Sequence, residues 1–131
     1  MKRLFFAVLM MVCSVSWAEW KKAGSTDSFY AYYDKSTIRR NGKIVKMWQM
    51  KDYFEEQDEG NGKNYKSQKL RHAFNCMDDT AALITVVAYS GSMGEGKIVF
   101  SGDIKEEKWD WDSVVPGSVG EAMLEIACSK K

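Results

Sequence analysis

Cys76 and Cys128 restrict the fold of this chain more than any other pair of residues, because they predict a covalent link between two distant segments. The third cysteine, Cys13, lies in an N-terminal segment that we expect to be removed. An exported chain with an even number of cysteines is expected to form disulfides, and only one pairing is then possible. That bond would close a loop of about 50 residues and stabilise the fold by on the order of 4 kcal/mol. Two free buried thiols or a metal pair are the alternatives, although two distant cysteines suit a metal site poorly.

The N-terminus has the pattern of a cleavable export signal. A positively charged start is followed by an apolar run over residues 4–15 and by the small residues Ser16 and Ala18. We therefore expect a signal peptide over residues 1–18, and one domain over residues 19–131. Because the apolar run is shorter than the roughly 20 residues of a membrane-spanning helix, we expect no transmembrane span after cleavage.

The composition fits a folded domain without a strong overall charge. The chain has 131 residues, of which 45% are hydrophobic and 13% aromatic, enough to build a core. Without the signal peptide it keeps 17 of its 19 Lys and Arg residues against 18 Asp and Glu, a net charge of −1. This balance predicts neither a nucleic-acid partner nor a membrane surface as a partner.

Turn signals divide the rest of the chain into short segments with strand character. The predicted strands cover residues 29–33, 44–53, 66–75, 81–89 and 97–102, with a tight turn at Asn41-Gly42 and loops over residues 55–64 and 90–96. Alternation within residues 66–75 places Gln68, Leu70, His72, Phe74 and Cys76 on one face, which is typical of a half-buried strand.

The hydrophobic period changes near the C-terminus. Val119, Ala122, Met123, Ile126 and Ala127 recur with helical spacing. Ser118 and Glu121 have the spacing of a capping box, and Cys128 lies at the end of the apolar stripe. The expected fold class is therefore α+β: an antiparallel sheet of about five or six strands, with a C-terminal helix packed on one face and tethered by a disulfide.

The sequence predicts no catalytic site. Gly91, Gly96 and Lys97 have the spacing of a phosphate-binding loop, but Ile98 stands where the hydroxyl of a Ser or Thr is required. The only histidine, His72, lies on an apolar strand face, where packing is a more common role than catalysis. We therefore expect a protein that is not an enzyme and that needs no cofactor or metal ion.

Two groups of basic residues are candidates for binding. The first is a basic stretch around the first tight turn, with Arg39, Arg40 and Lys43 between Lys35 and Lys46, and the second is Lys130 and Lys131 at the end of the chain. The first group can bind an acidic partner such as a sulfated glycan, and a free C-terminal lysine can be recognised by its ammonium and carboxylate groups. Solvated, solubilising side chains are the alternative interpretation of both groups.

Alternation in the segment Trp109-Asp110-Trp111-Asp112 places both indoles on one side of the chain and both acids on the other. Exposed tryptophans are enriched at the centres of binding surfaces, for proteins or carbohydrates. The interpretation that we favour from the sequence is instead a lid over the core, just before the final helix.

Several short motifs resemble, in their order, those of the surface-adhesin protein E family of Gram-negative bacteria. They are Trp20, Tyr32-Tyr33-Asp34, Ile38-Arg39-Arg40-x-Gly42, Val45-x-x-Trp48-x-x-x-Asp52-Tyr53, Ser67, Cys76, Tyr89, Met93-Gly94-x-Gly96, Trp109, Pro116-Gly117-Ser118 and Cys128. The resemblance covers nearly the whole chain after the signal peptide.

This resemblance implies an antiparallel sheet with a disulfide-tethered helix, in agreement with the residue patterns. It also implies a non-enzymatic protein on the cell surface that binds host matrix or plasma proteins, such as vitronectin, laminin and plasminogen. The sequence has no lipidation signal, because Met11 and Val12 precede Cys13 where small residues are required. A soluble periplasmic envelope protein that binds a bacterial partner is therefore the alternative.

Overall fold

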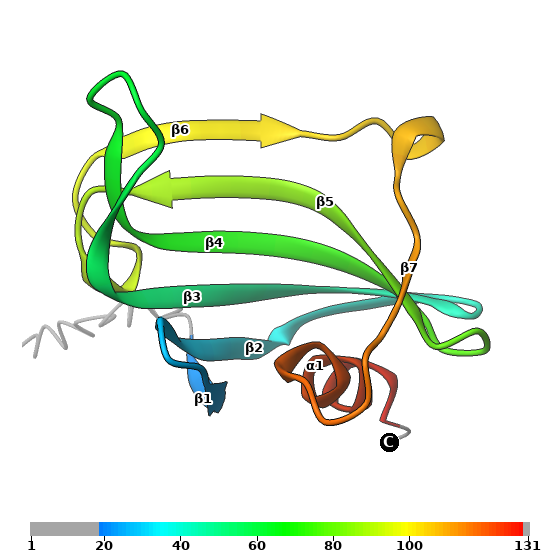
Figure 1. Ribbon diagram of the computed structural model, residues 1–131. Coiled ribbons are helices and arrows are strands. Elements are labelled where there is room, and N and C mark those ends of the chain that lie inside the picture. The colour runs from blue at the N-terminus through cyan, green and yellow to red at the C-terminus, as the bar shows by residue number, and fades with distance from the viewer. Residues whose placement is uncertain (1–18, 130–131) are drawn as a thin grey trace, which may run out of the picture.

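A curved antiparallel sheet forms most of the molecule (Figure 1), which a computed structural model describes over residues 19–129. Strands β1 to β6 lie side by side in chain order, and the short β7 pairs with one end of β5. The strands are β1 (Lys21–Ser25), β2 (Phe29–Asn41), β3 (Ile44–Asp58), β4 (Asn64–Asn75), β5 (Thr80–Tyr89), β6 (Ile98–Asp103) and β7 (Asp112–Ser113). The predicted α+β class is confirmed. Sequence patterns missed β1 and β7, because neither is an apolar run with a clear alternation.

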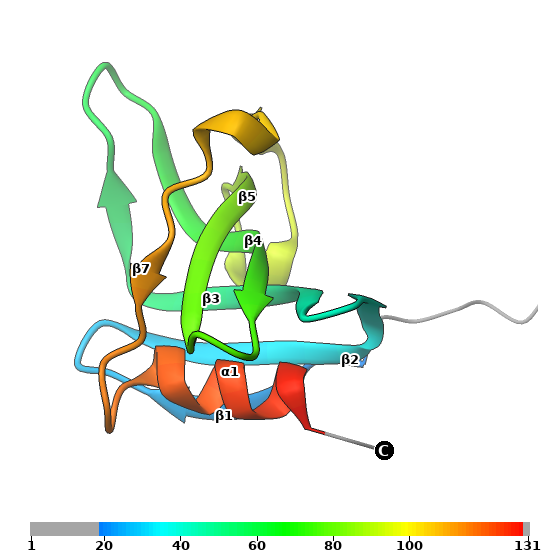
Figure 2. The same ribbon diagram turned by 90° about the vertical axis from the view of Figure 1, so that its right-hand side faces the viewer.

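Helix α1 (Val119–Cys128) packs across one face of the sheet, close to β1 and β2 (Figure 2). Ala31, Val45, Met47 and Phe74 from the sheet form a core cluster with Met123, Leu124 and Ala127 from the helix. The predicted disulfide between Cys76 and Cys128 is present, and it links the residue after β4 to the last residue of α1. Covalent and apolar contacts therefore hold the helix against the same face.

The N-terminus of α1 has the predicted cap. Ser118 Oγ accepts a hydrogen bond from the backbone N–H of Glu121 at 3.2 Å. In the reciprocal half of a capping box the Glu121 carboxylate would accept the N–H of Ser118. Here it accepts the N–H of Gly117 at 3.3 Å instead. The helix therefore begins where the sequence predicts. Its Glu121 carboxylate, however, accepts from the residue before the N-cap instead of from the N-cap itself.

The tight turn predicted at Asn41-Gly42 is confirmed, and its two central residues are Gly42 and Lys43. Asn41 pairs with Ile44 in the ladder between β2 and β3. Gly42 has a φ of +61°, which glycine adopts without steric cost and which suits the first position of a hairpin turn. The turn presents Lys43 at the tip of this hairpin.

Two predictions about the strands were wrong. Residues 55–64 do not form one loop, because β3 continues to Asp58 and Gln57 pairs with Tyr65 across the ladder to β4. Nor is β4 buried on one face only: Ser67 and Ala73 are fully buried although they face away from α1. The 90–96 loop, which contains the 3₁₀ turn η1 (Ser92–Gly94), covers the Ser67 end of that second face. Its Gly91 carbonyl accepts a hydrogen bond from Ser67 Oγ at 2.6 Å.

Among the residues that the structure describes, no helix is long and apolar enough to cross a membrane.

Candidate functional site

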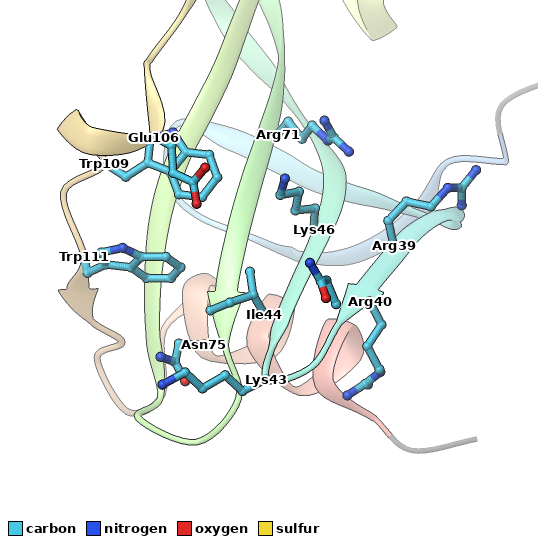
Figure 3. Close-up of a pocket in the computed structure, with 11 residues that line it drawn as sticks. Arg39, Arg40, Lys43, Ile44, Lys46, Arg71, Asn75, Glu106, Trp109 and Trp111 are labelled. Carbon is cyan, nitrogen blue, oxygen red and sulfur yellow. The ribbon is translucent and has the colours of Figure 1, made fainter.

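A hollow of about 560 Å³ lies on the sheet face opposite α1, between the β2–β3 hairpin and the segment that follows β6. Figure 3 shows basic side chains from β2, β3 and β4 on one side of it and two tryptophans on the other. We call it the basic hollow. Its charged and aromatic lining residues are Arg39, Arg40, Lys43, Lys46, Arg71, Glu106, Trp109 and Trp111.

The basic side of the hollow depends on a large bulge in β2. Asp34 pairs with Trp48, and the next paired residue on β2 is Arg39, opposite Lys46. The intervening residues 35–38 therefore oppose a single residue of β3, which places Arg39 on the same face as Asp34 and Lys46. Without the bulge, strand alternation would direct Arg39 to the helix side of the sheet.

Asp34 stabilises this bulge from a buried position. Its Oδ1 accepts hydrogen bonds from the backbone N–H of Ser36 at 2.9 Å and from Ser36 Oγ at 2.6 Å. Its carbonyl accepts from Thr37 Oγ1 at 2.6 Å, and Thr37 Oγ1 in turn accepts from the N–H of Trp48 at 3.0 Å. Asp34 is only 2% exposed, so the two bonds to Oδ1 replace water around a carboxylate that solvent hardly reaches.

Two of the arginines differ in how their guanidinium groups are held. Arg39 Nη1 donates to the carbonyls of Ser36 at 3.1 Å and of Ile38 at 2.9 Å, which fixes its direction over the bulge. Arg71 reaches the hollow from β4, and its buried Nε has no hydrogen-bond partner within residues 19–129. The hydrogen bonds of Arg39 go to backbone carbonyls, and none is found for Arg71 Nε among the described residues. Both guanidinium groups therefore keep their positive charge available to a ligand.

The tryptophans form the other side. Trp109 follows the 3₁₀ turn η2 (Glu106–Lys108), and its Nε1 donates to the carbonyl of Ile104 at 2.8 Å. Its ring centroid lies 6.1 Å from that of Trp111, with an edge-to-face angle of 67°. Trp111 is 37% exposed. The pair therefore presents apolar surface to the hollow in a fixed orientation.

These tryptophans are not a lid over the core cluster beneath α1, because neither indole packs against it. The alternation itself is as predicted, because Trp109 and Trp111 line the basic hollow while Asp110 and Asp112 line a separate hollow that contains His72. The segment from Trp109 to Asp112 leads into β7, which pairs with the start of β5. Its tryptophans and its aspartates therefore face two different surfaces of the molecule.

The other residues singled out in the sequence lie elsewhere. Lys130 and Lys131 fall outside the described residues. His72 lies on the helix side of the sheet, 6.0 Å from Phe74 between ring centroids. Burial and, to a smaller extent, the positive charge of Lys51 lower the pKa of His72 to about 4. The imidazole is therefore neutral at physiological pH.

The basic hollow is suited to an anionic ligand with a flat or apolar part. Five of its lining residues are cations, and Glu106 is the single anion among them. Planar guanidinium groups bind carboxylate, sulfate and phosphate oxygens in pairs, while indole faces stack on sugars or pack against apolar side chains. In the part of the chain that the structure describes, no three His, Cys, Asp or Glu side chains are grouped as metal ligands.

The sequence located one side of this site only. Arg39, Arg40 and Lys43 were candidates from their local cluster, and the structure brings all three to the hollow. Arg71 was missed because it is isolated in the sequence. The signal that could have revealed it is alternation within β4, which places Arg71 on the face opposite His72. On that face Arg71 pairs with Trp48 of β3.

Comparisons with known proteins agree with this fold. A family model described as surface-adhesin protein E matches residues 17–129. No curated protein sequence matches the chain significantly.

Solved structures of Haemophilus influenzae protein E are similar in fold. Crystal form II of that protein has a TM-score of 0.57 and 16% identity, covering 75% of this chain and 79% of that chain. Protein E from non-typeable Haemophilus influenzae has a TM-score of 0.57 and 14% identity, covering 87% of this chain and 79% of that chain. At such low identity the likeness concerns the path of the backbone and not the residues of the basic hollow.

Proposed function

Because this chain belongs to the surface-adhesin protein E family, we propose that it is an exported, non-enzymatic, adhesin-like protein whose basic hollow binds host matrix or plasma proteins. Vitronectin and laminin are the partners with which this proposal is best tested first. The partner surface is expected to carry carboxylates or sulfated sugars.

One observation carries this proposal: five cations and two tryptophans from separate segments converge on one hollow. The domain without its signal peptide has a net charge of −1, so the positive charge is a local property of this face. A local positive patch steers acidic partners and contributes to the association rate and to specificity. Partly exposed tryptophans supply the apolar anchor that charge alone does not, and they are frequent at binding hot spots.

The chemistry of the hollow supports binding and not catalysis. Its side chains are donors and cations, and the one lining carboxylate, Glu106, has no histidine, serine or cysteine beside it in the lining set. A nucleophile and a general base within hydrogen-bond reach are the usual signs of a hydrolytic site.

Charge reversal tests the proposal. Arg39→Glu/Arg40→Glu should weaken binding to immobilised vitronectin or laminin by roughly tenfold or more at low salt, and the difference from wild type should shrink at high salt. The matched control is Lys63→Glu/Lys97→Glu, which makes the same charge change at exposed lysines outside the basic hollow. Equal binding by wild type and both variants at low salt would remove the basic hollow from the proposal.

A further inference from the structure

Another hollow, of about 510 Å³, lies on the helix side of the sheet beside the first turn of α1. It adjoins the hollow lined by Asp110 and Asp112, with which it shares His72. We call it the helix-side hollow. It is lined from β3 and β4 by Gln49, Lys51 and His72, and from the start of α1 by Val119 and Gly120. It shares no residue with the basic hollow.

The helix-side hollow contains a lysine without a compensating acid. Among residues 19–129, no Asp or Glu lines it. Burial lowers the pKa of Lys51. The Lys51 ammonium lies 4.9 Å from the ring centroid of Phe29, a contact that only partly replaces water. A partly buried cation with no anion is costly unless a ligand supplies the negative charge.

Two hydrogen-bonding groups beside Lys51 are also unused. Gln49 is 8% exposed, and its buried Nε2 has no hydrogen-bond partner within residues 19–129. The buried Nδ1 of His72 also has none within the described residues. Rotation of the terminal amide of Gln49 exchanges its two polar atoms at little cost, so its donor can turn toward a ligand in the hollow.

The first turn of α1 adds backbone donors at the same place. Ser118 Oγ accepts a hydrogen bond from the N–H of Glu121. The N–H groups of Val119 and Gly120 lie in the first turn, where the helix has no carbonyl to accept them. A helix N-terminus carries a partial positive charge and favours anions. α1 is ten residues long, which is enough for this effect.

The remaining wall of the helix-side hollow is apolar. Phe29, Phe74 and Met123 line it beside the polar groups. A small inorganic anion would leave this surface empty, whereas an aliphatic chain or an apolar side chain would cover it.

We propose that the helix-side hollow binds an organic carboxylate, with the carboxylate group at Gln49, Lys51, His72 and the N-terminus of α1, and the apolar body against Phe29, Phe74 and Met123. Such a carboxylate can come from a fatty acid or from the C-terminus of a peptide. The inference is independent of the proposed adhesin function, because it uses the other face of the sheet.

The direct test is NMR titration of the disulfide-bonded protein with hexanoate, with hexan-1-ol as the neutral analogue. Hexanoate should give saturable shifts of the Val119 and Gly120 amides and of the His72 ring, with a dissociation constant of about 1 mM or below. Hexan-1-ol should bind at least roughly tenfold more weakly, because it lacks the charge. An acetylated tripeptide ending in Leu, as free acid and as amide, distinguishes the peptide source from the fatty-acid source.

Two variants complete the test. Lys51→Met should lose binding of hexanoate by roughly tenfold or more, while Lys63→Met, at an exposed lysine outside both the basic hollow and the helix-side hollow, should bind as wild type does. Lys51→Met leaves no buried partner unpaired, so it should fold with an unchanged or higher melting temperature. Absence of saturable shifts with both hexanoate and the free-acid peptide, equal binding of hexanoate and hexan-1-ol, or full binding by a folded Lys51→Met would each overturn the proposal.

Discussion

Lys46 and Trp109 meet across the basic hollow, with the lysine Nζ 5.3 Å from the centroid of the indole ring. Lys46 belongs to β3, in the middle of the sheet, whereas Trp109 belongs to the connection that follows β6. The contact joins the cationic side of the hollow to its aromatic side, and it orients the lysine over the ring face. A change on either side is therefore expected to alter binding at the other.

We predict that Trp111→Ala weakens binding to the host protein by about 1–3 kcal/mol, because it removes an exposed aromatic anchor. Trp111 is 37% exposed and lies outside the core cluster, so the midpoint of thermal unfolding should hardly change. Equilibrium binding by surface plasmon resonance measures the effect. Phe54→Ala, which removes a ring that is 43% exposed and lies outside the hollow, is the control and should bind normally.

We predict that Asp34→Ala lowers the free energy of unfolding by about 1–3 kcal/mol, since it leaves the hydrogen-bond donors of the β2 bulge without their acceptor. Loss of the bulge also shifts Arg39 away from Lys46, so binding at the basic hollow should fall with stability. Urea denaturation and the binding assay are run on the same variant. Asp34→Asn keeps an acceptor at Oδ1 and should be much milder. If it is as destabilising as Asp34→Ala, the hydrogen bonds of Oδ1 do not hold the bulge.

We predict that Cys76→Ala/Cys128→Ala lowers the free energy of unfolding by about 2–4 kcal/mol, because the disulfide restricts a long loop of the unfolded chain. The sheet should persist in the far-UV circular dichroism spectrum, while the amides of α1 should exchange faster with solvent. Reduction of the wild-type protein with dithiothreitol should reproduce the shift in the denaturation midpoint. An unchanged midpoint after verified reduction would contradict the role given to this bond.

We predict that stability falls as the pH decreases from about 6.5 to about 4, with His72 responsible for part of the loss. The folded protein keeps His72 neutral down to about pH 4, whereas the unfolded chain takes up a proton near pH 6.5, so acid favours the unfolded state in this window. Lys51 adds to the effect by repelling the imidazolium.

Urea denaturation at a series of pH values, on wild type and on His72→Leu, isolates this contribution from that of the carboxylates. Between about pH 6.5 and pH 4 the free energy of unfolding should fall less in the variant than in wild type. The difference is the contribution of His72 and amounts to a few kcal/mol over this window. Parallel curves for the two proteins would mean that His72 titrates normally.

Local signals predicted most of the fold. The helix and its cap followed from the spacing of Val119, Met123 and Ile126 and from Ser118, because all these determinants lie within one short segment. The end of β3 could not be predicted, because its acidic residues look like a loop and only pairing of Gln57 with Tyr65 makes them a strand. Strand assignments of this kind depend on a partner that the local sequence does not contain.

The candidate site shows the same limit. The basic turn is visible as a cluster, but its meeting with Trp109 depends on the bulge at Asp34 and on the path of the chain along β5. Neither is encoded in local spacing. The two tryptophans were interpreted as a lid because nothing in the sequence places them on the face opposite α1.

The central claim, that this protein meets host molecules at the cell surface, is tested most directly by treating intact cells with a protease that cannot cross the outer membrane. The protein is then followed by immunoblot, with a soluble periplasmic protein as the internal control. We expect the protein to be degraded while the periplasmic marker survives. Survival of both would contradict the claim and would point to a periplasmic envelope protein with a bacterial partner.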